Sequence, residues 1–366
     1  MLYIPVEQAH QLMVAVFTKL GVPEEDAQIC AEVLIASDLR GIESHGIGRL
    51  KMYYDRIKQG VQQPVTKIDV IRDKAATAVW DGNHGMGHVI GVKAMQAAID
   101  KAKQYGLGAV AVRNSTHYGI CGYYASMAIQ QDMIGMTFTN ARPSVCPTNG
   151  VFPILGTNPI CFGAPTDLPY PFLYDAATSI TQRGKIEVLD REEKPTPEGW
   201  AIDMENRPYT DTKRLLQDLL DLKAALLPIG GSEEITGSHK GYGLSVMVEI
   251  LCAALQNGSF LADLHGTTED GKPAPYKLGH FFLAINIDFF TDLADFKHTT
   301  GQILRTIKAT KIAPGKDKIW VAGEKEYESE KLVRQRGIPL VPNLQKNIIA
   351  MQKELDLNII NLSAEK

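Results

Sequence analysis

The chain has 366 residues, a length that allows two domains of ordinary size and a well-buried core. With 45% hydrophobic and 22% charged residues, its composition excludes a disordered or fibrous protein. The formal net charge of −4 offers no excess of basic residues for nucleic acid or anionic membranes. No segment approaches the ~20 apolar residues of a membrane helix, and the N-terminus lacks a signal-peptide pattern. We therefore expect a cytoplasmic protein.

The cysteines and histidines give no pattern of metal binding. The five cysteines are odd in number, widely spaced and without a C-x-x-C pair, so we expect buried free thiols rather than disulfides or a zinc knuckle. His84 and His88 lie four residues apart, but they stand among glycines and lack a neighbouring carboxylate or third ligand. We predict no metal site.

Residues 1–65 are predicted to form an N-terminal helical segment. Leu12, Val16 and Leu20 recur at helical spacing. The acidic run Glu24–Asp26 follows a Gly and a Pro, as expected for the first turn of a second helix.

Residues 66–325 alternate strand-like and helix-like segments, which predicts an α/β domain. Val92–Tyr105 is an amphipathic helix ended by Gly106, and Tyr123–Gln131 is a weaker one. The predicted strands are Thr77–Trp80, Ala109–Arg113, Ile134–Thr139 and Ile160–Ala164.

The second half of the chain begins with an irregular stretch. Asp190–Asp211 is rich in charge, Pro and Gly, and is predicted to be a long surface loop. Gly241–Gln256 predicts an apolar helix. Residues 326–366 are predicted to form a C-terminal helical segment that packs back on the N-terminal part.

Ser44 and His45 precede Arg49 and Tyr53, which lie four residues apart and would share a helix face. Together they offer a proton carrier, a hydroxyl to orient it and a cation for a carboxylate. The same residues also fit a helix N-cap with exposed side chains, which spacing alone favours.

Three further motifs fit either a site or ordinary structure. The segment Asn114–Gly119 places His117 directly after a predicted strand, where α/β proteins hold their sites, but it also fits a turn. The segment Gly237–Gly243 would let the backbone, with Lys240, approach an anion. Asp175 follows an apolar run and could hold a ribose hydroxyl. No stretch has the G-x-G-x-x-G spacing of a Rossmann fold.

Taken together, seven motifs resemble those of the type-2 malate/L-lactate dehydrogenase family, which includes sulfolactate, ureidoglycolate and diketogulonate members. The similarity extends from about Val6 to about Pro342. The motifs are Glu43–Arg49, Asn114–Gly119, Leu155–Pro159, Asp175–Ser179, Leu227–Gly231, His239–Leu244 and Gly323–Glu324.

The resemblance implies a non-Rossmann fold with a mixed sheet between helical layers, and a homodimer. By motif match, His117, His45 and Ser44 would be catalytic, and Arg49 and Tyr53 would bind substrate. NAD or NADP would be held by Asp175, Ala176, Ala177, His239, Lys240, Gly323, Glu324, Lys325 and Asn140. Asn140 is followed by Ala141, where many relatives have a serine. Lys185 stands where imine-reducing relatives carry an acid, which argues against that chemistry.

The expected function is hydride transfer between a nicotinamide cofactor and a 2-hydroxy acid/2-oxo acid pair, with malate/oxaloacetate as the best candidate. Lactate, sulfolactate and ureidoglycolate are the alternatives within the family. A dicarboxylate needs a second cation, which Arg142 or Lys185 could supply. A hydrolase using Ser44 or Ser115 lacks a G-x-S-x-G motif to support it. A small-acid-binding relative without turnover is the non-enzymatic alternative.

Overall fold

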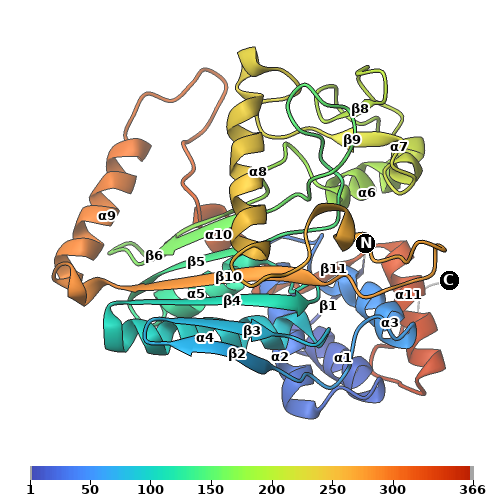
Figure 1. The fold of residues 1–366 in the computed structure, drawn as a ribbon, viewed down its shortest axis with the longest axis horizontal. Coiled ribbons are helices and arrows are strands. Elements are labelled where there is room, and N and C mark those ends of the chain that lie inside the picture. Colours follow the sequence, from blue (N-terminus) through green and yellow to red (C-terminus); the bar gives the residue numbers. More distant parts are fainter. Residues whose placement is uncertain (1, 363–366) are drawn as a thin grey trace.

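The structure is a computed structural model that describes residues 2–362. A seven-stranded mixed sheet lies at its centre (Figure 1). Its strands are Asp69–Lys74 (β2), Thr77–Asp81 (β3), Leu107–Ser115 (β4), Met133–Thr139 (β5), Ile160–Ala164 (β6), Phe172–Ala176 (β7) and Leu278–Asn286 (β10). The order is β2-β3-β4-β10-β5-β6-β7, with β3 and β4 parallel and all other neighbours antiparallel. The four predicted strands are confirmed.

The central strand β10 was not predicted from the sequence. It pairs with β4 and β5, and Phe282 lies opposite Val110 on one side and Thr137 on the other. Helices cover both faces of the sheet here, so the strand carries a continuous apolar run in place of the alternation that marks a half-exposed strand.

Helices lie on both faces of the sheet (Figure 1). On one face, Gly87–Tyr105 (α4) and Cys121–Ile129 (α5) bury a core that includes Ile90, Tyr124 and Phe282. The opposite face is covered by Ser238–Ala253 (α8). The predicted helix at Val92 is confirmed, although it begins earlier; it ends as expected at Gly106, whose φ is +81°.

Both ends of the chain share a separate core. The helices Val6–Lys19 (α1), Glu24–Leu39 (α2), Leu50–Lys58 (α3) and Pro342–Glu354 (α11) surround it, and Leu2–Ile4 (β1) pairs with Ile338–Leu340 (β11). Phe17, Leu34 and Tyr53 from the first part meet Ile348 and Met351 from the last. This core holds α3 and the loop before it against the sheet domain.

A smaller unit covers the remaining side, with Arg183–Arg191 (α6), Ala201–Asp203 (β8), Thr212–Asp218 (α7) and Ala224–Leu226 (β9). The prediction of an irregular surface loop over residues 190–211 is wrong in part. β8 pairs with β9, and Ile202 is buried because it packs with Leu227. Leu293–Lys308 (α9) and Glu324–Arg336 (α10) complete the helices used below. Within residues 2–362, none of the helices is long and apolar enough to cross a membrane.

Candidate active site

Two adjoining cavities lie between the sheet and α6. The larger, about 690 Å³, is lined by residues that follow β4 and β5 and by residues from β7 to α6. The smaller, about 390 Å³, is lined from α3, from residues after β5 and from the start of α6. Both volumes suit small-molecule binding. The residues common to the two linings are His45, His117, Ala141, Thr157, Gln182 and Leu278. The two predicted catalytic histidines therefore stand where the cavities meet.

The loop between α2 and α3 fixes His45. Its Nδ1 lies 2.8 Å from the Ser44 hydroxyl. Asp38, buried on α2, accepts a 2.8 Å hydrogen bond from the Ile47 amide. Gly46 lies directly against the Asp38 carboxylate, which leaves no space for a Cβ. The sequence motif around Ser44 is thus a rigid loop, rather than an N-cap with exposed side chains.

His117 is held from behind by a buried hydroxyl. The Tyr53 Oη lies 2.6 Å from its Nδ1, and the Gly119 amide donates to the same nitrogen at 3.3 Å. The rings of His117 and His45 are stacked, with centroids 5.5 Å apart. Tyr53 itself is fully buried and lies outside both cavity linings, and its hydroxyl contacts His117. Its role in substrate binding stays a prediction.

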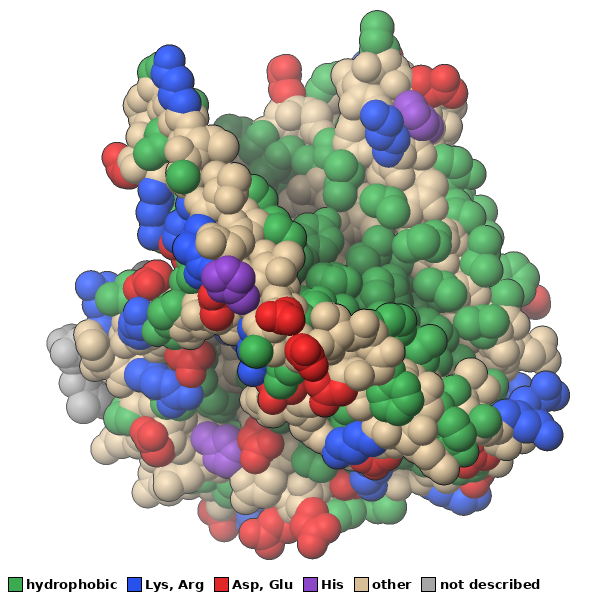
Figure 2. Space-filling view, turned by 90° about the vertical axis from the view of Figure 1, so that its left-hand side faces the viewer, with side chains coloured by type: hydrophobic (Ala, Val, Ile, Leu, Met, Phe, Trp, Pro, Cys, Tyr) green, Lys and Arg blue, Asp and Glu red, His purple; other side chains and the backbone are tan. Residues whose placement is uncertain are grey.

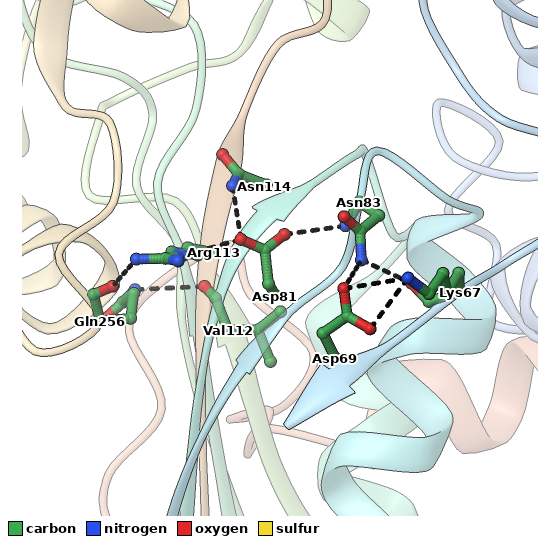
Figure 3. Close-up of polar contacts among 8 residues, drawn as sticks. All are labelled: Lys67, Asp69, Asp81, Asn83, Val112, Arg113, Asn114 and Gln256. Carbon is green, nitrogen blue, oxygen red and sulfur yellow. Dashed lines mark hydrogen bonds and ion pairs between the residues drawn. The ribbon is translucent and has the colours of Figure 1, made fainter. Parts of the chain in front are cut away.

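A polar network anchors the end of β4, the strand that leads to His117 (Figure 3). Asp81, the last residue of β3, accepts 2.8 Å hydrogen bonds from Arg113 and Asn114. Gln256 binds the same segment. Its side-chain amide donates to the Val112 carbonyl, and its backbone carbonyl accepts from the Arg113 side chain. Asn114 adopts a φ of +50°, a conformation that Asn tolerates better than most residues.

His280 on β10 ties the same motif to the neighbouring strand. Its two ring nitrogens each lie 2.8 Å from a hydroxyl, Nε2 from Ser115 and Nδ1 from Thr139. The Tyr118 ring stacks on the imidazole with centroids 4.3 Å apart. Ser115 is fully buried and lines neither cavity, so the hydrolase hypothesis gains no accessible serine there.

Burial keeps both cavity histidines neutral at neutral pH. It lowers the pKa of His45 to about 3, with a smaller contribution from the charge of Arg49. Burial also lowers the pKa of His117 well below its ordinary value, and the nearby positive charges of Arg56 and Arg49 add to the effect. Neutral imidazoles serve as hydrogen-bond donors or as proton acceptors.

Positive charge gathers in the smaller cavity. Four arginines line it, with no Asp or Glu among the described residues of that lining: Arg49, Arg56, Arg142 and Arg183. Glu187, just outside it, lies 3.0 Å from Arg183 and 3.7 Å from Arg49. Sequence reasoning missed Arg56 and Arg183 as cavity residues. Arg56 follows Arg49 by seven residues, two helical turns, and that spacing was the available signal.

The larger cavity holds the acidic residue predicted for the cofactor. Asp175, on β7, lines it together with Ala176 and Ala177. One oxygen of Asp175 accepts a 2.6 Å hydrogen bond from the Gly122 amide at the start of α5. Burial raises the pKa of this carboxyl to about 6, although the Gly122 bond opposes the shift. Lys185 also lines this cavity, and not the one that contains the arginines.

Asn140 lines the larger cavity, but its side-chain amide already has protein partners. Its Oδ1 accepts from the Gly279 amide at 2.8 Å, and its Nδ2 donates to Glu249 and to the Ser259 carbonyl. The backbone N–H of Asn140 donates to the Gly279 carbonyl at 3.3 Å and its carbonyl accepts from the Thr139 hydroxyl at 2.9 Å, so a direct contact of Asn140 with the cofactor stays a prediction.

Other residues predicted for the cofactor lie outside both linings. His239 and Lys240 are exposed in the first turn of α8. Glu324 is buried and its Oε1 accepts from Lys308 at 2.6 Å. Its neighbours Gly323 and Lys325 are likewise absent from the linings, although Glu326 contributes to the larger one. These contacts stay predictions.

Known proteins are similar to this chain in both sequence and fold. The family model "Malate/L-lactate dehydrogenase" matches residues 4–349. The chain belongs to this family. It is 44% identical to the malate dehydrogenase of Pyrococcus horikoshii, over 96% of this chain and 95% of the relative. It is 39% identical to the L-sulfolactate dehydrogenase of Methanocaldococcus jannaschii, over 96% and 97%. The crystal structure of malate dehydrogenase from Entamoeba histolytica superimposes with a TM-score of 0.95 at 43% identity, covering 98% and 99% of the two chains.

Family membership makes the chain an oxidoreductase that acts on a 2-hydroxy acid. It confirms the resemblance deduced from the seven motifs and the non-Rossmann mixed sheet between helical layers. A dehydrogenase of this family uses a nicotinamide cofactor. Among the described residues, no three His, Cys, Asp or Glu side chains come together as metal ligands. All five cysteines are buried and unpaired, as predicted.

Proposed function

We propose that this enzyme is an NAD(P)-dependent malate dehydrogenase that interconverts malate and oxaloacetate. The observation that carries the proposal is the group of four arginines in the smaller cavity, which lacks a lining carboxylate among the described residues. Glu187 pairs with Arg183 and Arg49, which leaves Arg56 and Arg142 without an acidic partner among the described residues. This excess of positive charge favours an anion, and it suits a substrate with two acidic groups better than a monocarboxylate.

Two of these arginines take separate roles in the proposal. Arg49, beside His45, binds the C1 carboxylate in a two-pronged charge-assisted hydrogen bond. Arg142, which follows β5 in the same lining, binds the second carboxylate. Lys185, the other candidate for this second cation, lies in the larger cavity. A sulfonate in place of the second carboxylate would be held by the same cations, so sulfolactate is the alternative substrate.

The larger cavity fits a nicotinamide cofactor. Its 690 Å³ adjoin the arginine-lined cavity at His45 and His117, and one oxygen of Asp175 is free of protein partners among the described residues. Asp175, Ala176 and Ala177 would hold NAD or NADP there, with His239, Lys240 and the Gly323–Lys325 turn contributing beyond it. When bound, the cofactor supplies or accepts the hydride.

Oxidation of the 2-hydroxy acid requires a neutral imidazole to accept the hydroxyl proton at C2, and reduction of the 2-oxo acid returns that proton. His45 and His117 both meet this requirement, because burial keeps them uncharged. The substrate's carboxylates would offset the charge of Arg49, which removes one of the causes that lower the pKa of His45. Ser44 orients the His45 ring through its 2.8 Å contact.

A homodimer is part of the proposal. Hydrophobic side chains gather in the hollow of one face of the molecule (Figure 2). Exposed apolar residues stand on the two helices of this region, with Met247 and Ile250 on α8 and Ile303 and Ile307 on α9. Contiguous exposed apolar surface of this kind marks a protein interface. A second copy of the chain would cover it, and light scattering tests this.

The test of function is the oxidation of NADH and NADPH against oxaloacetate, pyruvate, 2-oxoglutarate, glyoxylate and 3-sulfopyruvate. Rapid turnover with oxaloacetate and slow turnover with pyruvate is the expected result. Preference for pyruvate would overturn the two-anion argument. Preference for 3-sulfopyruvate would keep the argument and change the substrate to sulfolactate.

A further inference from the structure

The Nδ1 atom of His117 faces two hydrogen-bond partners at once. The Gly119 backbone amide lies 3.3 Å away and can only donate. Nδ1 must therefore be the unprotonated nitrogen of the ring. The Tyr53 hydroxyl, 2.6 Å from the same atom, then also donates to it.

From this we infer that Tyr53 and the Gly119 amide lock His117 in the neutral tautomer with its proton on Nε2, so that His117 donates a hydrogen bond to the substrate's C2 oxygen and His45 carries the proton. This assignment rests on the proposed dehydrogenase function. The Nε2 atom has no hydrogen-bond partner among the described residues, and the ring lines both cavities. It is therefore free to meet a ligand.

His117 is poorly suited to accept a second proton. A proton on Nδ1 would place an N–H against the Gly119 N–H, and a backbone N–H cannot accept a hydrogen bond. Burial opposes a positive charge on the ring, and so do the guanidinium groups of Arg56 and Arg49. The Tyr53 hydroxyl could turn to accept from a protonated Nδ1, but the Gly119 amide could not, and a buried polar group left without its partner is costly.

The hydrogen-bond partner of His45, in contrast, fits either protonation state of the ring. Its Nδ1 lies 2.8 Å from the Ser44 hydroxyl, which can rotate to donate or to accept. When Nε2 of His45 takes the hydroxyl proton of the 2-hydroxy acid, the ring becomes an imidazolium whose Nδ1–H donates a hydrogen bond to Ser44 Oγ, so this contact is kept. In the reverse direction the same Nε2 proton goes to the C2 oxygen as the carbonyl is reduced. Each histidine thus keeps one role in both directions.

Histidine-selective ¹⁵N NMR tests the lock without any turnover. In the wild-type enzyme we expect the Nδ1 signal of His117, assigned by its loss in His117→Gln, to be that of an unprotonated nitrogen throughout the neutral pH range. Tyr53→Phe should shift this signal towards the protonated position. Tyr54→Phe is the matched control, because the neighbouring Tyr54 hydroxyl is buried without a hydrogen-bond partner. A protonated Nδ1 in the wild type would overturn the inference.

Kinetics separate the roles of the two histidines. The amide N–H of Gln can replace the imidazole N–H as a hydrogen-bond donor, but it cannot transfer a proton. His117→Gln should therefore retain at least tenfold more kcat than His117→Ala. His45→Gln should be as inactive as His45→Ala, roughly 10²-fold or more below wild type. The opposite ranking would overturn the assignment. If the wild type reduces no 2-oxo acid, the proposed function fails, while the NMR result still decides the tautomer.

Discussion

The Oε2 atom of Glu249, on α8, accepts a 2.8 Å hydrogen bond from Nδ2 of Asn158. Its Oε1 accepts from Nδ2 of Asn140 at 3.3 Å and from the Leu261 amide at 3.0 Å. Every partner of this buried carboxylate is a donor. Asn140 lines the larger cavity and Asn158 lies between two residues that do, so one charged side chain holds that wall in place.

Glu249→Gln should destabilise the enzyme and weaken cofactor binding. The new amide group would turn N–H donors towards groups that are themselves donors, and such a mismatch costs about 1–3 kcal/mol. Urea unfolding measures the loss of stability and the KM for NADH measures the effect on the wall. Glu233→Gln, at an exposed residue of the same charge, is the control. Equal behaviour of the two variants would contradict this role for Glu249.

Gly184→Ala should raise the KM for the 2-oxo acid. A Cβ at Gly184, in the first turn of α6, would lie 2.8 Å from the Ser44 Cβ and 3.2 Å from Nη2 of Arg49, so the loop that carries both must move. Gly243→Ala is the matched control in α8, where a Cβ meets no atom within 4 Å. This control should keep its KM and gain about 0.5–1 kcal/mol of stability, because Ala favours a helix. A normal KM in Gly184→Ala would show that the loop tolerates the shift.

Arg142→Gln should change substrate preference more than overall activity. If Arg142 binds the second acidic group, its loss removes a charge-assisted hydrogen bond and lowers kcat/KM for oxaloacetate roughly 10- to 100-fold, with little effect on pyruvate. Lys185→Gln lies in the other cavity and should leave the ratio of the two substrates unchanged. Steady-state kinetics with both substrates decides. A changed ratio in Lys185→Gln alone would reverse the assignment of the second cation.

The free energy of unfolding should fall as the pH is lowered, in part through His88. This side chain is fully buried without a hydrogen-bond partner, and burial lowers its pKa from 6.5 to about 3. Below pH 6.5 the unfolded chain therefore takes up a proton that the folded chain does not, and stability is lost as pH falls towards 3, at about 1.4 kcal/mol per pH unit.

His88→Leu should reduce the slope of the unfolding free energy against pH by the contribution of one histidine. Urea unfolding at several pH values between neutrality and pH 5 measures the slope in the variant and in the wild type. An unchanged slope would mean that His88 is accessible to protons in the folded state. The comparison at pH 8, where the histidine is neutral in both states, isolates the packing change.

By itself the sequence determined the family, four of the sheet strands and the main helices. Apolar periodicity ended by Gly106 predicts α4, and the motifs around His45, His117 and Asp175 predict residues that the structure places around adjoining cavities. These features are local, since each depends on side chains within a few turns or on a short motif.

Only the tertiary structure decided the remaining features, because they depend on contacts between distant segments. β10 lies at the centre of the sheet and its apolar run has no alternation that would mark it as a strand. Arg56, Arg142 and Arg183 come from separate segments and share one cavity, while Lys185 turns to the other. The partner of Tyr53 is likewise set by folding, since the N-terminal core brings its hydroxyl behind His117.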